Sequence, residues 1–183
     1  MFKSQISTIL RLDAQSRKYF RGVYAIDELN SSHVAINEQP NDQLWLTTTT
    51  TATATASDAA VRSGTAGGGA FVVNYDESNK PGSHWVGVFR DEQGHVDFFD
   101  STGLPPLDDR LRCFLLGPNY SYNPNQYQQI LGNACGFYVV YFILQRSRHR
   151  KADDILEQLS ACGVDSDYFV KDYVYTRYKP IFN

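Results

Sequence analysis

One of the three cysteines stands between a polar turn and a long apolar run, in the stretch LGNACGFYVVYFI. A thiol is a good nucleophile only as the thiolate, and the unpaired N–H groups at a helix N-terminus stabilise that form. Cys135 falls where such a helix would begin, with Gly132 and Asn133 as the expected turn and cap before it. Gly136 removes a side chain beside the sulfur, which leaves room for a substrate carbonyl. The stretch therefore predicts a nucleophilic thiol at the mouth of a buried helix.

The tripeptide Ala-Cys-Gly occurs a second time and supplies an internal control. Cys162 closes its predicted helix, where the negative end of the helix dipole disfavours a thiolate. We therefore expect Cys135 to be reactive and Cys162 to be inert. A cysteine beside an apolar run is more often a packing residue, so the residues that accompany Cys135 must decide between the two interpretations.

A catalytic thiol needs a general base, and the base needs a group that orients it. His84 begins a predicted strand, so its imidazole would project at the rim of the sheet, with Trp85 shielding one side from water. Asp100 ends the next strand and would lie near His84 if the two strands form a hairpin, where its carboxylate would fix the imidazole tautomer. Asp97 is the rival acid but sits nearer the turn. Taken alone, His84 would be an ordinary surface histidine and Asp100 a turn-forming residue.

Acyl transfer also needs hydrogen-bond donors for the developing oxyanion. The backbone N–H of Cys135 is one candidate, and the side-chain amide of Gln128 or Gln129 is another. Adjacent residues on an extended segment point in opposite directions, so only one of the two glutamines can face the sulfur. The local sequence leaves that choice open.

The elements that must position these residues follow from hydrophobic periodicity and turn signals. The expected strands are AFVVNY, HWVGVFR and HVDFFDS, of which the last two are joined by the turn DEQG, and a weaker one in NYSYNPNQYQQ. A short helix is expected in SQISTILRLDAQSRKYF, and further helices in LDDRLRCFLL before Gly117, from Cys135 to about Arg148, in KADDILEQLSAC before Gly163, and in the aromatic tail. The sum predicts an α+β fold, a small and mainly antiparallel sheet packed by helices.

Length and composition bound the answer. The length of 183 residues and the 42% apolar content predict that residues 1–183 form one globular domain with a substantial core. Residues 47–69 form a low-complexity piece rich in Thr and Gly, which we interpret as a flexible insertion or a weak edge strand. The formal charge of -3 predicts no general affinity for nucleic acid or anionic membranes. The dense basic stretch RSRHRK is interpreted as the solvated end of a helix.

Targeting and metal signals are absent from the sequence pattern. The longest apolar run is too short for a bilayer, and the N-terminal residues lack the core of a signal peptide. We therefore expect a soluble intracellular protein. The cysteines show no zinc-type spacing, so we expect neither a metal site nor a disulfide scaffold.

The candidate residues follow one another in the order His–acid–Gln–Cys. This order resembles that of the adenovirus protease (adenain) and its relatives, which include the SUMO-deconjugating cysteine proteases. The resemblance is greatest to adenain-like proteases of DNA viruses and of Maverick/Polinton-type elements. HWVGVF is similar to that family's His-Trp strand, FFDSTGLPP to its Phe-acid-x-x-Gly motif, and NACGFYVVYFI to its Cys-Gly helix. The similarity runs from about Ile6 to Ile143.

What the resemblance implies is a cysteine endopeptidase with a triad of Cys135, His84 and Asp100. Alignment with the adenain-like relatives selects Gln128 as the oxyanion donor, whereas the spacing of the SUMO proteases would select Gln129. The resemblance also implies viral precursor polypeptides as substrates, cleaved at glycine-containing sites during capsid or virion maturation. The expected location of such an enzyme is the host nucleus or cytoplasm, with packaging in the virion.

The substrate channel is expected between Trp85 and Gly136, where glycine would fit best. No cofactor is required by the residues. Adenain is activated by DNA and by a peptide attached through a disulfide, so the resemblance implies both activators. The acidic charge of this chain argues against DNA, and Cys113 matches the peptide-receiving cysteine only by rough position, with packing within a helix as its alternative.

Two other functions use the same residues differently. A deconjugase that removes ubiquitin-like or SUMO-like modifiers would share the chemistry and differ in its substrate. A non-catalytic binding domain would keep the fold and lack turnover, although all four catalytic positions are filled.

Overall fold

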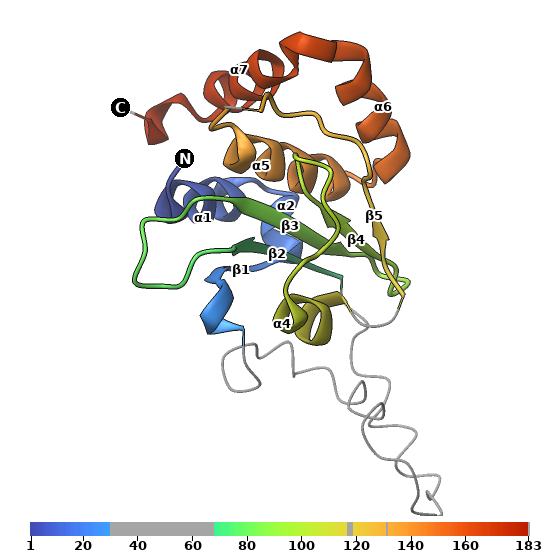
Figure 1. Cartoon of the computed structure of the whole chain (residues 1–183). Coiled ribbons are helices and arrows are strands. Elements are labelled where there is room, and N and C mark those ends of the chain that lie inside the picture. Colours follow the sequence, from blue (N-terminus) through green and yellow to red (C-terminus); the bar gives the residue numbers. More distant parts are fainter. Residues whose placement is uncertain (30–67, 117–118, 131, 183) are drawn as a thin grey trace, which may run out of the picture.

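The computed structural model describes residues 1–29, 68–116, 119–130 and 132–182. A sheet lies in the middle of the molecule, and helices cover both of its faces (Figure 1). Residues 47–67, which are most of the predicted low-complexity insertion, lie outside the described residues, as does Gly117, the expected end of a helix.

Within the described residues, five strands form one sheet in the order β1-β2-β3-β4-β5. The strands are β1 (Phe20–Ala25), β2 (Gly69–Asn74), β3 (Trp85–Arg90), β4 (Val96–Phe99) and β5 (Ser121–Tyr122). The central strands β2, β3 and β4 pair antiparallel, whereas β1 pairs parallel to β2 and β5 parallel to β4. The predicted hairpin is the β3–β4 pair. The α+β class is confirmed, and the parallel edges make the sheet a mixed one.

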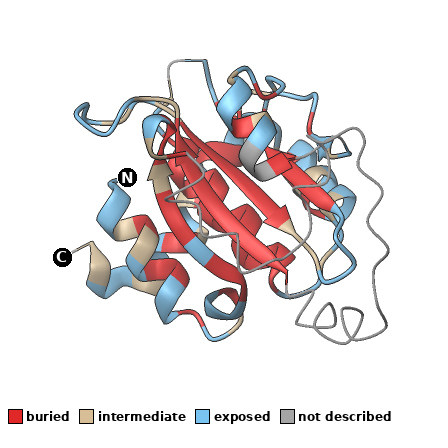
Figure 2. Ribbon diagram, turned by 90° about the horizontal axis from the view of Figure 1, so that it is seen from below, coloured by how far each residue is buried: buried red, intermediate tan, exposed pale blue. Residues whose placement is uncertain are grey.

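Alternate residues of the central strands serve two different cores, because successive side chains of a strand point to opposite faces. Ala70 and Val72 of β2 pack in the cluster that contains the long apolar helix, whereas Phe71 and Val73 pack in the cluster on the other face. The strands are therefore buried on both sides, as the red ribbons of Figure 2 show.

The helical elements are α1 (Lys3–Leu12), α2 (Ser16–Tyr19), η1 (Ile26–Glu28), α4 (Asp109–Leu111), η4 (Arg112–Leu116), α5 (Cys135–Arg146), α6 (Ala152–Cys162), η5 (Gly163–Asp165), α7 (Ser166–Tyr178) and η6 (Lys179–Ile181). Helices α1 and α5 lie against one face of the sheet, with α6 and α7 outside α5, and α4 lies on the opposite side (Figure 1). No helix among the described residues is long and apolar enough to span a membrane.

Helix α5 is buried along its whole length. A helix that is apolar all round is stable only when it is covered on every side, and here β3, α1, α6 and α7 all contact it. Phe142 stacks on Phe99 of β4 with ring centroids 4.6 Å apart. Each large apolar side chain buried in this way stabilises the fold by about 1.5–3 kcal/mol. The position of Cys135 at the first residue of α5 is therefore fixed by the core.

The basic stretch RSRHRK lies at the C-terminal end of α5, where Arg146 is the last helical residue, and it is only partly solvated. Arg146 is 9% exposed, and its Nη2 lies 2.8 Å from Oδ2 of Asp97. Arg148 bonds through Nη2 to Oδ2 of Asp13, the residue that ends α1. Two of its arginines therefore tie α5 to β4 and to α1.

Candidate active site

The sulfur of Cys135 lies where the start of α5 meets the start of β3. Hydrogen bonding from the backbone N–H groups of Trp85 and Gly136 lowers the pKa of the Cys135 thiol. The first of these donors comes from β3 and the second from the first turn of α5. Two N–H groups directed at one sulfur stabilise a negative charge on it.

The cap of α5 differs from the prediction. The N-cap residue is Ala134, which offers no side-chain hydrogen bond. Asn133 is exposed, and its Oδ1 lies 3.4 Å from Nζ of Lys171 on α7. The expected Asn133 cap was therefore wrong. Because no side-chain oxygen occupies the helix mouth, the N–H of Gly136 is available to the sulfur of Cys135 itself.

The two Ala-Cys-Gly cysteines have opposite pKa shifts. Burial by itself raises the pKa of Cys135, but the hydrogen bond from His84, the N–H groups of Trp85 and Gly136 and the His84 charge together lower it below the ordinary thiol value of 9.0. Burial and the charge of Asp165 raise the pKa of Cys162. The directions agree with the helix-dipole argument, since Cys162 is the last residue of α6.

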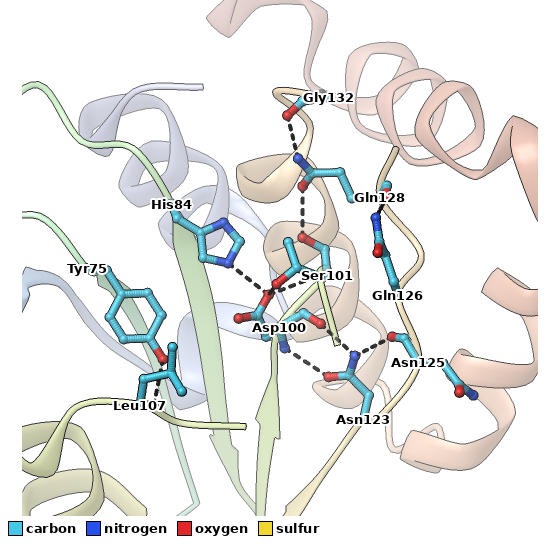
Figure 3. Close-up of polar contacts among 11 residues, drawn as sticks. Tyr75, His84, Asp100, Ser101, Leu107, Asn123, Asn125, Gln126, Gln128 and Gly132 are labelled. Carbon is cyan, nitrogen blue, oxygen red and sulfur yellow. Dashed lines mark hydrogen bonds and ion pairs between the residues drawn. The ribbon is translucent and has the colours of Figure 1, made fainter. Parts of the chain in front are cut away.

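His84 stands between the carboxylate of Asp100 and the sulfur of Cys135. Its Nε2 lies 2.8 Å from Oδ1 of Asp100 (Figure 3), which leaves Nδ1 for the hydrogen bond with Cys135. The ring of Tyr75 lies parallel to the imidazole, with centroids 6.0 Å apart and 4° between the planes. The ring is therefore held by a carboxylate at one edge and by an aromatic face.

The protonation of His84 follows from these neighbours. Burial by itself lowers the pKa of His84, but the hydrogen bonds with Asp100 and Cys135 and the charges of those two groups raise it to about 9. A raised imidazole pKa beside a lowered thiol pKa favours the imidazolium–thiolate pair at neutral pH. In that pair the sulfur carries the negative charge that a thiol needs to act as a nucleophile.

Asp100 follows β4 and is 1% exposed. Its Oδ1 accepts from Nε2 of His84, from the backbone N–H of Thr102 at 2.8 Å and from the Thr102 hydroxyl at 2.7 Å. Its Oδ2 is buried and has no hydrogen-bond partner among the described residues. The carboxylate therefore faces the imidazole and is screened from water.

The side chain of Gln128 lies in the same cluster, and that of Gln129 does not. Gln128 is 7% exposed, and its Nε2 donates to the carbonyl of Gly132, three residues before Cys135, while its Oε1 accepts from the Ser101 hydroxyl at 2.9 Å (Figure 3). Gln129 is exposed, and its Nε2 donates to the carbonyl of Val164 at 3.2 Å. An amide nitrogen carries two N–H groups, and the contact with Gly132 uses one of those of Gln128.

The rival acid belongs to a different cluster. Oδ1 of Asp97 lies 3.1 Å from Nε2 of His95, and Oδ2 lies 2.8 Å from Nη2 of Arg146. Ser121 of β5 also contacts His95, at 3.2 Å. Asp97 therefore links β4 to α5 and does not reach His84.

Gly136 is packed, contrary to the expectation of open space beside the sulfur. A Cβ on Gly136 would lie 3.0 Å from Cβ of Met1, 3.4 Å from Cδ1 of Trp85 and 3.5 Å from Cδ1 of Ile6. The missing side chain thus allows α5 to approach α1 and β3 closely. Trp85 is itself 6% exposed and forms part of this contact.

Three residues around His84, Asp100 and Gln128 were not predicted from the sequence. Asn123 bonds to the backbone of Asp100 on both sides, the hydroxyl of Ser101 bonds to Gln128, and Tyr75 stacks on His84. A single Asn, Ser or Tyr in a polar loop carries no signal until the loop is placed. The FFDST motif was the available clue for Ser101, since it follows the predicted acid directly.

Among the described residues, no group of three or more His, Cys, Asp and Glu side chains could hold a metal ion. Cys113 is exposed on η4 and is not packed in the core, so the packing alternative for this residue was wrong.

Comparison with known proteins bears on the fold and on the class of protein. No protein-family model matches the chain. Over 99 residues the chain is 32% identical to a protein of Acanthamoeba polyphaga mimivirus that carries the name "Putative thiol protease". The match covers 48% of this chain and 32% of that relative, so the chain spans about a third of the relative's length. The sequence is thus similar to a viral protein of the thiol protease class.

Two solved structures are similar to the chain. The central domain of an uncharacterized protein from Legionella pneumophila gives a TM-score of 0.54 at 14% identity, covering 99% of this chain and 98% of that chain. A protease of ASFV gives a TM-score of 0.39 at 20% identity, covering 48% of this chain and 37% of that chain. The first of these shows that the whole fold recurs in another protein.

Proposed function

We propose that the chain is a viral or virus-like cysteine endopeptidase in which Cys135 is the nucleophile, His84 the general base and acid, and Asp100 the group that orients His84. One observation carries the proposal. The imidazole of His84 lies between the buried carboxylate of Asp100 and a sulfur at the N-terminus of α5, and the pKa of the thiol is lowered while that of the imidazole is raised to about 9.

The first half of the reaction forms a thioester. The Cys135 thiolate attacks the carbonyl carbon of the scissile peptide, and a carbon–sulfur bond forms as the carbonyl becomes an oxyanion. The free N–H of the Gln128 amide and the backbone N–H of Cys135 donate to that oxyanion. The intermediate then collapses, the carbon–nitrogen bond breaks, and His84 gives its proton to the leaving amine.

The second half releases the acid. His84, now neutral, takes a proton from water as the water attacks the thioester carbonyl. The carbon–sulfur bond breaks, the product leaves as a carboxylic acid, and the imidazolium–thiolate pair returns. Throughout the cycle the carboxylate of Asp100 keeps Nε2 of His84 occupied, so Nδ1 remains directed toward the sulfur.

The substrates that this proposal assigns are viral precursor polypeptides, cut at glycine-containing sites. The similarity to a viral protein named as a thiol protease supports the class of enzyme. Because Trp85 and Gly136 are packed against α1, selection for glycine must come from groups other than an open space at Gly136. Activation by a peptide, and action in the infected cell or in the virion, belong to the same proposal.

A peptide-library cleavage assay under reducing conditions tests the proposal. We expect wild-type protein to cleave a subset of peptides, with and without added DNA, and Cys135→Ala to cleave none. The matched control is Cys162→Ala, which should retain wild-type rates. Absence of cleavage by the wild type in the presence of DNA and of candidate activating peptides would favour the non-catalytic binding domain.

A separate labelling experiment distinguishes an endopeptidase from a deconjugase. An electrophilic probe on the diglycine tail of a folded ubiquitin-like protein is compared with a short peptide that carries the same electrophile. Equal labelling of Cys135 by both fits the endopeptidase. Much faster labelling by the folded probe would replace the precursor substrate with a ubiquitin-like one.

A further inference from the structure

All hydrogen bonds to the carboxylate of Asp100 from the described residues go to one oxygen, Oδ1. Among the described residues, His84 is the one partner of this carboxylate from another segment, because the other donors are the N–H and hydroxyl of Thr102. Thr102 lies two residues further along and moves with Asp100. Oδ2 accepts no hydrogen bond from the described residues. Its position relative to His84 must therefore come from the backbone of Asp100.

The backbone of Asp100 is hydrogen-bonded to a side chain from a separate segment of the chain. Oδ1 of Asn123 accepts from the N–H of Asp100 at 2.9 Å, and Nδ2 of Asn123 donates to the carbonyl of Asp100 at 2.6 Å (Figure 3). The second proton of Nδ2 goes to the carbonyl of Asn125 at 3.1 Å. Asn123 is 2% exposed, and every polar atom of its amide is used.

An amide side chain is the group suited to this contact. A backbone N–H needs an acceptor and the carbonyl of the same residue needs a donor, and among uncharged side chains the amide of Asn or Gln offers both at fixed spacing. β5 ends at Tyr122, directly before Asn123, and pairs with β4, which ends at Phe99, directly before Asp100. We call the two hydrogen bonds between the Asn123 amide and the Asp100 backbone the Asn123 clamp. The clamp continues the β4–β5 ladder past the point where strand pairing stops.

The same segment also carries the oxyanion donor. The backbone N–H groups of Tyr127 and Gln128 both donate to the carbonyl of Ser101, at 2.9 and 3.0 Å. The hydroxyl of Ser101 in turn donates to Oε1 of Gln128. Residues 123–128 are thus fastened to residues 100 and 101 at both ends, so the acid and the oxyanion donor are held by one pair of interlocked turns.

We propose that Asn123 is a positioning residue, which sets the carboxylate of Asp100 in register with His84 and thereby acts on the imidazolium–thiolate pair. The inference rests on the proposed function, because it assigns Asn123 to the same reaction. Asn123 touches neither the substrate nor the sulfur in this account. It acts only through the placement of Asp100.

The consequence of losing the clamp follows from the charges that face His84, which are those of Asp100 and Cys135, with the neutral ring of Tyr75 stacked alongside. In Asn123→Ala the N–H and carbonyl of Asp100 lose their partners, and the carboxylate is no longer held at hydrogen-bond distance. The imidazolium is then less stabilised. Misplacement of a catalytic group by about 1 Å costs on the order of a hundredfold in rate.

The test compares wild type, Asn123→Ala and the matched control Asn125→Ala, whose side chain is exposed and takes no part in the clamp. Two experiments are done on each protein. The first measures kcat and KM for a cleaved peptide across pH. The second measures the rate of Cys135 alkylation by iodoacetamide across pH, followed by peptide mapping.

For Asn123→Ala we expect kcat to fall about tenfold to a hundredfold, as for a misplaced catalytic group. We expect KM to change by less than about threefold and the alkaline limb of the activity profile to move to lower pH. We also expect the alkylation profile, which follows the thiolate form of Cys135, to shift along the pH axis. Asn125→Ala should match the wild type. If Asn123→Ala does not fold, Asn123→Ser takes its place, because its hydroxyl can serve the N–H or the carbonyl of Asp100 but not both.

A lower melting temperature with both pH profiles unchanged would overturn the inference and leave Asn123 a purely structural residue. The alkylation profile reports on the His84–Cys135 pair without any substrate. Its response to Asn123→Ala therefore stands even if no peptide is cleaved, so failure of the proposed function and failure of this inference give different results.

Discussion

Nε2 of His84 lies 2.8 Å from Oδ1 of Asp100, and the carboxylate is almost completely buried. A buried carboxylate at this distance stabilises the imidazolium and fixes which ring nitrogen faces Cys135. The relationship separates the two acids that the sequence offered, because Asp97 pairs with His95 and Arg146 instead.

Asp100→Asn is expected to lower kcat about a hundredfold, within the range that general acid–base catalysis contributes. The substitution also removes a group that raises the pKa of His84, so the alkaline limb of the activity profile should move to lower pH. Kinetics over a range of pH provide the measurement.

Asp97→Asn is the matched control for Asp100→Asn. It leaves Arg146, whose side chain is 10% exposed, without its close partner, and breaking such a buried pair costs about 3 kcal/mol or more. We expect a lower free energy of unfolding and an unchanged pH profile. An altered pH profile for Asp97→Asn with a normal one for Asp100→Asn would exchange the two assignments.

Gln128→Ala should lower kcat about a hundredfold to a thousandfold, the cost of removing one oxyanion donor. Gln129→Ala should change it by less than about twofold, because the amide of Gln129 points to Val164 and away from the sulfur. Steady-state kinetics on one cleaved peptide decide between them. Equal losses for both variants would mean that the loop moves when substrate binds.

The activity profile should be bell-shaped. Its acid limb reports protonation of the Cys135 thiolate and should lie below the ordinary thiol pKa of 9.0, and its alkaline limb reports loss of the His84 proton at about pH 9. Because the folded pKa of His84 exceeds its ordinary value of 6.5, its contribution to stability is complete below pH 6.5 and is lost as pH rises through 9. Kinetics and thermal melts over this window measure both effects. An alkaline limb near 6.5 would show an imidazole without a carboxylate partner.

Gly136→Ala should destabilise the fold by about 1–3 kcal/mol, because an added methyl group overpacks a filled core. The new Cβ would lie 3.0 Å from Cβ of Met1 and 3.4 Å from Cδ1 of Trp85. Denaturant unfolding gives the change in stability. A normal free energy of unfolding combined with a raised KM would restore the interpretation of Gly136 as open space for substrate.

The sequence was sufficient where the signal is periodic or local. The apolar run after Cys135 predicted α5, and the turn DEQG between HWVGVFR and HVDFFDS predicted the hairpin that brings Asp100 to His84. The parallel pairing of β1 with β2 and of β5 with β4 could not be predicted, because neither edge strand is joined to its neighbour by a short turn.

The details that the sequence did not supply depend on segments distant in the chain. Asn123 acts on a residue 23 positions away, so its role becomes visible only when β5 is placed beside β4. The crowding at Gly136 comes from α1, near the other end of the chain. The resemblance favoured Gln128 over Gln129, but the bonds that bury Gln128, between the 127–128 backbone and the carbonyl of Ser101, could not be predicted.

The central claim is that Cys135 is a nucleophile because His84 and the start of α5 hold it as a thiolate. Its most direct test is the rate of iodoacetamide alkylation at pH 7, mapped to individual cysteines, in wild type and in His84→Ala. We predict that Cys135 reacts faster than Cys162 in the wild type, and that His84→Ala slows Cys135 while leaving Cys162 unchanged. Equal rates for the two cysteines, or a Cys135 rate that does not depend on His84, would contradict the account.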